Sequence, residues 1–324
     1  MLTRRSALAC ALASVANPLS ALARATGSGL PFKLFDAHAH LKSDDLTHYP
    51  RVPPAPPGPG PAPPVPTSET PEVVRVLRWM DQMGVEGAAA VQHRGTYGYD
   101  NRYILDSADQ YLGRLVPVVV LDPMDPQTPA MVRHLIAQHG LGGVRLTGAQ
   151  GADGTFAWLE SAPAQATWAA VNEGGLIMDL MTVPPGSSPA ALSAYARLAL
   201  RYPRARLVLD HCAWPDAVGP PDYGIGAAHR ALASYRNIYY KFTTVNLEAL
   251  RLAQIPARDA LRHIVATYGA DHVMWGSDIG NSAGLYSEMV SRIVAASAGL
   301  RSAERRQFLH DTGRAVLVRG GHPA

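Results

Sequence analysis

The sequence predicts the α/β class and, within it, a (β/α)8 TIM barrel formed by a single domain. Short apolar runs rich in β-branched residues alternate along the chain with patterns typical of amphipathic helices. Most of these runs are apolar throughout, as expected of parallel strands that are covered on both faces. Eight such strand–helix units in about 290 residues suit this barrel. A doubly wound open sheet is the alternative, but no glycine-rich phosphate loop follows the first strand.

Residues 1–25 are predicted to be an export signal rather than part of the fold. Arg4 and Arg5 precede a short apolar run, and small residues then lead to Ala-x-Ala patterns that end at Ala23 and Ala25. The run is shorter than the roughly 20 residues that a membrane-spanning helix needs. We therefore expect a twin-arginine signal, cleavage near Thr26, and a periplasmic or secreted protein. A disordered N-terminal tail is the alternative.

The segment from about residue 50 to residue 71 is dense in proline, which prevents helix and central strand. Too few residues precede it for a separate domain. We therefore expect a long extended loop within one barrel domain that covers residues 26–324. Thr70, Pro71 and Glu72 form a pattern typical of a helix start, with a cap, a proline at the first position and an acid in the first turn.

The strand and helix elements follow in alternation. The predicted strands are residues 33–38, 85–92, 115–122, 142–148, 175–181, 206–212, 237–243 and 272–278. Two of the helices have clear boundaries. One spans residues 72–83, with apolar residues repeating on one face. The other spans residues 189–201, where Ser188 is the cap and Pro203 follows the end.

Composition and charge exclude several classes of function. Hydrophobic residues make up 47% of the chain, which is enough for an ordinary globular core. The net charge of +3 is too small, and the charges too scattered, to indicate a nucleic-acid or membrane-surface partner. Cys10 lies in the predicted signal, so Cys212 would remain alone and could form no internal disulfide. We interpret Cys212 as a small buried apolar group, because no activating partner is evident.

Polar residues stand near the end of almost every predicted strand. In a (β/α)8 barrel the carboxyl ends of the strands meet at one rim, where active sites lie. The candidates at this rim are Asp36, His38, His40, His93, Arg145, Asp179, Asp210, His211, Lys241 and Asp278. Each has a structural alternative, such as an ion pair for Arg145 and Lys241 or a helix cap for Asp278. Their regular placement nevertheless predicts an active site.

The order of these residues resembles a known family. His-x-His on the first strand, a histidine on the sixth and an aspartate on the eighth are similar to the signature of the amidohydrolase superfamily. The segments FDAHAHL, GGVRLTG, LVLDHCAWPD, NIYYKFT and VMWGSDIGNS resemble successive motifs of its amidohydrolase-related branch. That branch contains 2-pyrone-4,6-dicarboxylate lactonases and sugar-lactone hydrolases. The resemblance, from about Phe35 to the C-terminus, implies a hydrolase of a cyclic ester or a related carboxylic ester.

The resemblance also suggests roles for the candidates. Asp278 would be the general base for water, and the histidines and arginine would polarise the carbonyl and stabilise the oxyanion. The catalytic candidates are Asp278, His38, His40, His211 and Arg145. The candidates for substrate binding are Asp179, His93, Trp214 and Lys241.

Whether the site holds a metal ion depends on the fourth and fifth strands. Metal-dependent relatives carry a further lysine or histidine there, whereas this chain offers Arg145 and Asp179. His38, His40 and Asp278 could supply three ligands for zinc or manganese. Because a cationic Arg145 would oppose a dication, the sequence favours a site without metal.

Trp214 stands where the dicarboxylate-specific relative has an arginine, so the pyrone dicarboxylate is not expected as the substrate. A tryptophan face suits a sugar or an aromatic ring instead. The alternatives are a metal-dependent amidohydrolase or decarboxylase of the same superfamily and a non-catalytic exported binding protein. The sequence indicates a small-molecule partner and leaves the substrate and the oligomeric state open.

Overall fold

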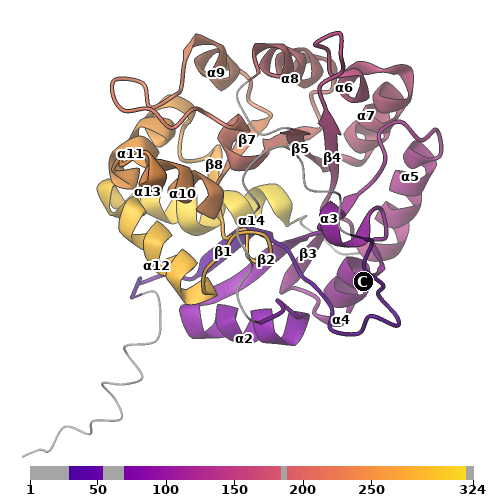
Figure 1. The fold of residues 1–324 in the computed structure, drawn as a ribbon, viewed down its shortest axis with the longest axis horizontal. Helices are drawn as coiled ribbons and strands as arrows, with labels where there is room; N and C mark the ends of the chain where they lie inside the picture. Colours follow the sequence, from indigo (N-terminus) through magenta and orange to yellow (C-terminus); the bar gives the residue numbers. More distant parts are fainter. Residues whose placement is uncertain (1–28, 54–68, 184–187, 319–324) are drawn as a thin grey trace, which may run out of the picture.

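A computed structural model of the chain describes residues 29–53, 69–183 and 188–318. The predicted signal and residues 54–68 of the predicted proline-rich loop lie outside these described residues. Within them, eight parallel strands are hydrogen-bonded in sequence order into one sheet (Figure 1). The strands are β1 (Leu34–Ala39), β2 (Val85–Val91), β3 (Leu115–Val120), β4 (Gly143–Ala149), β5 (Ile177–Val183), β6 (Arg206–Leu209), β7 (Ile238–Thr243) and β8 (Val273–Gly276).

The sheet closes between its first and last strands. Just past β8, the backbone N–H of Asp278 donates to the carbonyl of His38 over 2.7 Å. The N–H of His40 donates to the carbonyl of Ile279 over 2.9 Å. This closure and the sequential strand order confirm the predicted TIM barrel and exclude the open doubly wound sheet.

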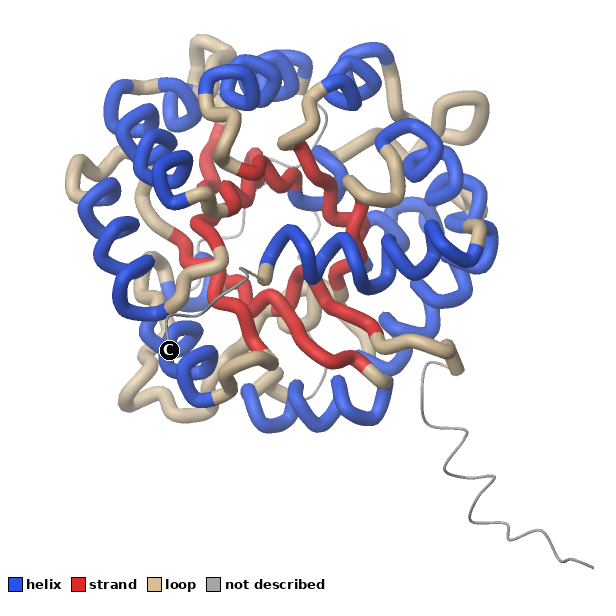
Figure 2. Tube along the Cα trace, turned by 180° about the vertical axis from the view of Figure 1, so that it is seen from behind, coloured by secondary structure: helices blue, strands red, loops and turns tan. Residues whose placement is uncertain are grey.

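Helices surround the barrel (Figures 1 and 2). The longer ones are α2 (Val73–Met83), α4 (Arg102–Gln110), α5 (Thr128–His139), α7 (Ala162–Gly174), α8 (Pro189–Arg201), α10 (Thr244–Leu252), α11 (Ala257–Tyr268) and α12 (Tyr286–Ala296). The shorter ones are α3 (Arg94–Tyr97), α6 (Ala157–Glu160), α9 (Ala227–Ala231), α13 (Ser302–Arg306) and α14 (Thr312–Leu317). The 3-10 and π turns are η1 (Asp210–Ala213), η2 (Leu232–Ser234), η3 (Ser297–Gly299) and η4 (Gln307–Asp311). Over the described ranges, none of the helices combines the length and apolarity that a membrane span requires.

The two helix boundaries predicted in detail have different outcomes. Helix α8 has the predicted bounds, and the Ser188 side chain accepts a hydrogen bond from the N–H of Ala191. Helix α2 begins one residue later than predicted, because Glu72 is its cap and not a first-turn acid. The Glu72 carboxylate accepts from the N–H of Val74 at 3.0 Å and from the Tyr103 hydroxyl at 3.1 Å. An acid can therefore replace the cap that Thr70 was expected to supply.

One end of the barrel is closed by the C-terminal helix α14. Figure 2 shows the molecule from behind, with a helix lying across the opening of the strand barrel. Val316 and Leu317 of α14 pack against apolar side chains of the barrel interior, including Phe35, Ile177 and Met274. The polar residues near the strand ends lie at the opposite end of the barrel. The sequence had not predicted this division into an apolar, covered end and a polar end.

A bulge in β1 lets this strand contribute side chains both to the apolar interior and to the polar end of the barrel. Phe35 and Ala37 belong to the apolar interior cluster, whereas His38 and His40 face the polar end. Odd and even residues of a regular strand point to opposite sides. Between the pairs Asp36–Ala88 and Ala39–Ala90, β1 contains one residue more than β2, and this bulge permits the change.

Candidate active site

The structure gathers all nine predicted site residues at one end of the barrel. Seven are buried: Arg145, Asp179 and Lys241 within β4, β5 and β7, His38 near the end of β1, and His40, His211 and Asp278 just after strand ends. His93 and Trp214 lie in the segments that follow β2 and β6, and both line a cavity at this end. The structure thus brings the predicted residues together, and their roles as a site remain predictions.

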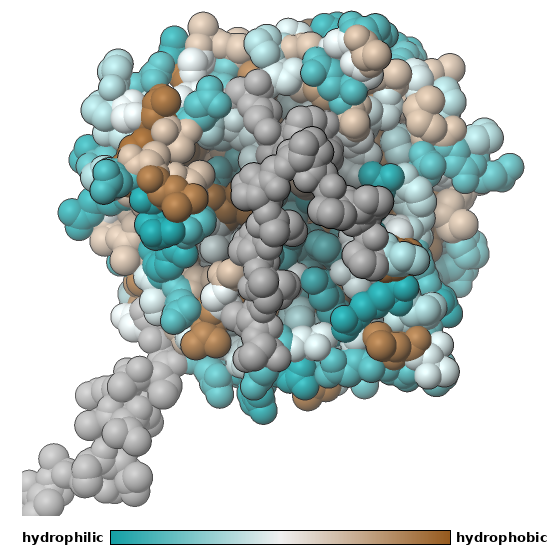
Figure 3. All heavy atoms as spheres, in the orientation of Figure 1, coloured by the Kyte–Doolittle hydropathy of each residue, from teal (hydrophilic) through white to brown (hydrophobic). Residues whose placement is uncertain are grey.

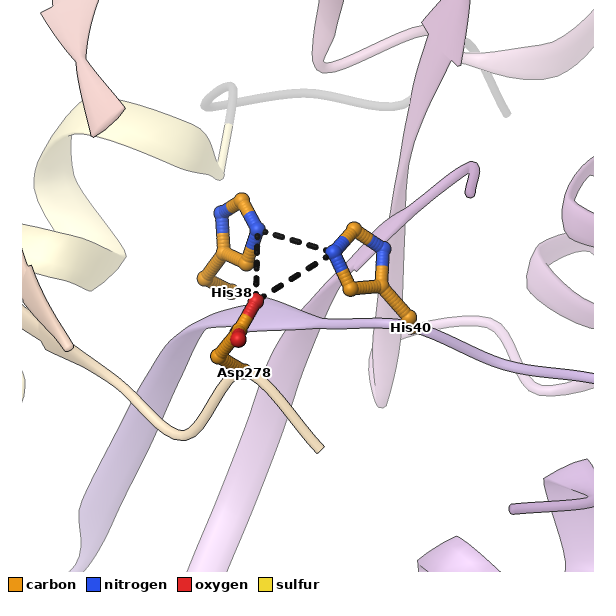
Figure 4. Close-up of side chains that lie close together, drawn as sticks. All are labelled: His38, His40 and Asp278. Atoms are coloured by element: carbon orange, nitrogen blue, oxygen red, sulfur yellow. Dashed lines mark hydrogen bonds and ion pairs between the residues drawn. The ribbon is translucent and has the colours of Figure 1, made fainter. Parts of the chain in front are cut away.

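His38, His40 and Asp278 form a compact triangle (Figure 4). The two Nε2 atoms lie 3.1 Å apart. Asp278 Oδ1 lies 3.5 Å from His38 Nε2 and 3.4 Å from His40 Nε2. Gly276 permits this arrangement, since a Cβ there would lie 2.5 Å from the Cβ of His38. Three strong ligand or proton-transfer atoms thus face one point.

The Asp278 carboxylate is held by one oxygen only. Its Oδ2 accepts hydrogen bonds from Asn281 Nδ2 at 2.9 Å and from Ser282 Oγ at 2.6 Å. Among the described residues, Oδ1 has no hydrogen-bond partner. Burial by itself would raise the pKa of Asp278, but the proximity of the His40, His211 and His38 imidazoles outweighs it and holds this pKa below 3.8. The free oxygen is therefore an ionised base or ligand.

The outer nitrogens of the two histidines have defined partners. His40 Nδ1 lies 2.8 Å from the carbonyl of Val91, which can only accept, so a neutral His40 presents the lone pair of Nε2 to the triangle. His38 Nδ1 lies 3.2 Å from Asp210 Oδ1 and 3.1 Å from Lys241 Nζ. Burial holds the pKa of His38 well below 6.5. Donation to Asp210 would free the Nε2 of His38 for a ligand in the same way.

Beneath His38 lies a buried network of two cations and two carboxylates. Lys241 Nζ is 2.5 Å from Asp179 Oδ2 and 3.3 Å from Asp210 Oδ1. Arg145 contacts Asp210 through both Nε, at 2.9 Å, and a terminal nitrogen, at 2.7 Å. Burial and the charge of Asp210 raise the pKa of Asp179 to about 7. Because Asp179 and Lys241 are fully buried, their placement supports His38 and Asp210, and a substrate contact would require movement.

The donor atoms of the triangle fit a divalent metal ion. A tetrahedral zinc ion with ligands at about 2.0–2.1 Å separates neighbouring ligand atoms by about 3.3–3.4 Å. The triangle of His38, His40 and Asp278 has sides of 3.1–3.5 Å. It is one of two potential ligand groups found within the described ranges, the other being His38, Asp179 and Asp210. The charge of Arg145, which favoured a metal-free site at the sequence level, is compensated here by Asp210.

His211 reaches the site from an unusual backbone turn. Four successive residues, His211 to Trp214, have φ between 52° and 58°, the left-handed region that non-glycine residues seldom adopt. The turn is held by a hydrogen bond from Asn246 Nδ2 to the carbonyl of His211, at 2.9 Å. It brings the ring of Trp214 to 4.5 Å from that of His211, centroid to centroid. Burial lowers the pKa of His211 below 6.5.

His93 is bound to protein groups through both ring nitrogens. Its Nε2 lies 3.3 Å from Asn281 Oδ1, and its Nδ1 lies 2.8 Å from Thr96 Oγ1. Since Asn281 donates through Nδ2 to Asp278, its oxygen is the acceptor for His93. Burial lowers the pKa of His93 to about 3. The predicted substrate-binding histidine is thus also a support for the Asp278 side of the site.

A cavity of about 470 Å³ opens onto these residues. Its lining combines cations, imidazoles and apolar side chains, and includes His40, Arg94, Arg145, Met181, His211 and Trp214. In the space-filling view of Figure 3, the strongly hydrophobic residues visible among those described form small separate groups. A cavity of this size and mixed lining suits a single-ring substrate with polar substituents.

Sequence reasoning missed the residues that support the predicted ones. Asp210 had been noted at a strand end without a role, and Asn281 and Ser282 had been quoted only within the VMWGSDIGNS segment. Thr243, which lies 2.7 Å from His211, was not considered as a functional residue. The polar cluster after Asp278 was a usable signal, because a carboxylate at a strand end needs nearby donors to fix it.

Comparisons with known proteins agree with this geometry. A curated relative, L-fucono-1,5-lactonase from Burkholderia ambifaria, is 29% identical over 196 residues, which are 60% of this chain and 65% of that protein. The matched region thus spans a little less than two thirds of the relative.

Solved structures share the barrel fold. A protein from Pseudomonas putida, assigned as a 2-pyrone-4,6-dicarboxylic acid hydrolase, is 24% identical with a TM-score of 0.65, and the match covers 89% of this chain and 98% of that one. An amidohydrolase from Burkholderia multivorans with bound zinc is 20% identical with a TM-score of 0.64, and covers 88% and 99% of the two chains. The amidohydrolase family profile matches residues 35–318. The chain therefore belongs to the amidohydrolase family.

Proposed function

We propose that the protein hydrolyses a lactone, with Asp278 as the base that activates water. The observation that carries this proposal is Oδ1 of Asp278, which has no hydrogen-bond partner in the described part of the chain and faces the Nε2 atoms of His38 and His40. Its other oxygen is fixed by two donors, so the carboxylate presents one free, ionised oxygen. That is the arrangement expected of a general base.

In the proposed reaction, water attacks the lactone carbonyl while its proton passes to Asp278 Oδ1. The carbonyl oxygen gains negative charge, and Arg145 and His211, which line the cavity, are the groups placed to stabilise it. The bond between the carbonyl carbon and the ring oxygen then breaks. The leaving oxygen takes the proton that Asp278 accepted from water, which regenerates the Asp278 carboxylate, and the product is an open hydroxy acid.

The site also accommodates a divalent ion, for which His38, His40 and Asp278 have suitable donor atoms. Such an ion, when bound, would polarise the carbonyl and lower the pKa of water. With such an ion, Asp278 and the two imidazoles would hold it through the atoms that face the triangle. Arg145 and His211 would still face the substrate oxygen.

We further propose a sugar-derived lactone as the substrate class. Trp214 and Met181 give the cavity an apolar side on which a sugar ring can pack, and Arg94 and Thr147 offer hydrogen bonds to hydroxyl groups. The likeness to L-fucono-1,5-lactonase supports this class. Asp179 and Lys241 would not contact the substrate directly. Their buried ion pair would hold His38 and Asp210 in position.

The test is a substrate panel of aldonolactones, the pyrone dicarboxylate, simple amides and hydroxybenzoic acids. We expect ring opening of one or more aldonolactones, measured as proton release, and little turnover of the pyrone dicarboxylate. Release of CO₂ from a hydroxybenzoate, or cleavage of an amide alone, would instead establish the metal-dependent decarboxylase or amidohydrolase. That second function is favoured by the ligand spacing of the triangle.

A further inference from the structure

Thr243 connects the end of β7 to the ring of His211. It is fully buried, and its Oγ1 lies 2.7 Å from His211 Nδ1. Among the described residues, His211 Nε2 has no hydrogen-bond partner, and the residue lines the cavity. The ring is therefore fixed to the protein through one nitrogen and leaves the other for a substrate.

The neighbours of Thr243 determine the direction of this hydrogen bond. Asn246 Nδ2 is used by the carbonyl of His211, and Asn246 Oδ1 accepts from the N–H of Thr243 at 2.9 Å. The Thr243 hydroxyl lies 2.7 Å from His211 Nδ1 and 3.5 Å from Asn246 Oδ1, which already accepts the N–H of Thr243. If the hydroxyl donates to Asn246 over the long contact, His211 carries its proton on Nδ1. If the hydroxyl donates along the much shorter contact, Nδ1 is the acceptor and the shorter distance gives the stronger hydrogen bond.

We propose that Thr243 is a positioning residue that holds His211 in the tautomer with its proton on Nε2. A neutral imidazole carries one ring proton, so a hydrogen bond accepted at Nδ1 leaves the N–H at Nε2. This N–H can donate to the carbonyl oxygen of a bound ester and stabilise the charge that develops there. The kinetic consequence rests on the proposed lactone hydrolysis, whereas the tautomer itself does not.

Asn246 fixes the backbone of the same histidine. It joins the N–H of Thr243 to the carbonyl of His211, across the left-handed turn that carries the imidazole. The backbone and the ring of His211 are thus both held by residues at the start of α10. A substitution at Thr243 should change the ring proton without changing the turn, because Asn246 remains in place.

The first experiment measures the tautomer in the intact wild-type protein. Two-bond ¹⁵N–¹H correlation spectra of protein labelled in histidine distinguish a protonated Nε2 from a protonated Nδ1, and a His211→Gln variant identifies the signal. We expect a protonated Nε2. A neutral His211 with its proton on Nδ1 would overturn the proposal, whether or not a lactone substrate has been found.

The second experiment compares Thr243→Val with Thr243→Ser. Valine keeps the shape but removes the hydroxyl, and we expect kcat to fall at least about tenfold with KM changed less than about threefold. Serine should restore kcat to within about threefold of wild type. Ser161→Ala is the control, because it removes a helix cap at α7 outside the residues that line the cavity.

The outcomes separate positioning from simple stability. A Thr243→Val protein with normal kcat, or a similar loss of kcat in Ser161→Ala at an equal fall in melting temperature, would overturn the proposal. If the valine variant does not fold, the wild-type spectrum and the serine variant still test the proposal. If no panel compound is turned over by the wild type, the proposed function fails, and the spectrum alone tests the tautomer.

Discussion

At the scale of single residues, the sequence predicted the candidate site residues but not the groups that orient them. His38 lies in β1, His40 directly follows that strand and Asp278 lies just past β8, so a barrel brings them to one rim. Asn281 and Ser282 donate hydrogen bonds to Asp278 Oδ2 and so leave Oδ1 facing the triangle. Both lie in an irregular segment whose path no periodicity describes. Such contacts depend on local backbone geometry rather than on residue type.

Replacement of Asp278 by asparagine tests the general base. Asparagine keeps an oxygen for Asn281 and Ser282 but loses basicity, so kcat should fall at least about a hundredfold with little change in melting temperature. Because the pKa of Asp278 lies below 3.8, its protonation should cause no loss of wild-type kcat between about pH 5 and pH 8. Turnover, its pH profile and thermal unfolding can be measured on the same samples. Near-normal turnover in the variant would remove Asp278 from the mechanism.

The metal question is also decided at single residues. Since the donor atoms of His38, His40 and Asp278 have the spacing of zinc ligands, added zinc should raise the melting temperature of the chelator-treated wild type. His40→Ala should lose this shift, whereas His48→Ala, at an exposed histidine, should keep it. Equal shifts in both variants, or none in the wild type, would support the metal-free site that the sequence favours.

At the scale of elements, the strands were predictable and the connecting turns were not. Apolar runs of the right length gave strand bounds within two residues, because burial on both faces leaves a clear pattern. The exception is the end of β6, where residues 210–212 were predicted as strand but belong to the turn η1. The turn from His211 to Trp214 has no such pattern, since none of its four left-handed residues is glycine. Surrounding contacts, including the hydrogen bond from Asn246, outweigh the local preference of the chain.

Ala213→Gly tests whether the turn is strained. Ala213 has a φ of 58°, where an L-residue is disfavoured by about 1–2 kcal/mol and glycine is not. The relief should offset the entropy cost of glycine, so the free energy of unfolding should stay level or rise. Ala196→Gly, inside α8, should instead lose about 1 kcal/mol. Urea unfolding of both variants is the measurement, and an equal loss in the two would show that the turn is not strained.

At the scale of the whole molecule, length and alternation were enough to predict one closed barrel, but not how its ends differ. Strand order follows from sequential strand–helix units, whose crossovers have one hand. The covering of one end by α14 depends on a short C-terminal segment of six helical residues, too short for a clear periodic signal. That covering matters for function, because it leaves the polar end as the route to the site.

The proposed export also concerns the whole molecule. If Arg4 and Arg5 form a twin-arginine signal, Arg4→Lys combined with Arg5→Lys should retain the protein inside the cell, because the export pathway reads the arginine pair. Arg24→Lys, beyond the apolar run, is the matched control and should still be exported. Cell fractionation and N-terminal sequencing are the measurements. An exported wild-type protein that still begins at Met1 would contradict the predicted cleavage near Thr26.

The two ends of the barrel should respond differently to substitution. Leu317 of α14 is fully buried against the apolar interior cluster, so Leu317→Ala should lower the free energy of unfolding by about 2–5 kcal/mol. Leu200→Ala, at a residue 71% exposed on α8, should change it by less than about 0.5 kcal/mol. Apolar side chains such as Ile177 and Met274 separate α14 from the candidate catalytic residues. The kcat of the folded Leu317→Ala protein should therefore stay within about twofold of wild type, and a tenfold fall in kcat would show that α14 is coupled to the site.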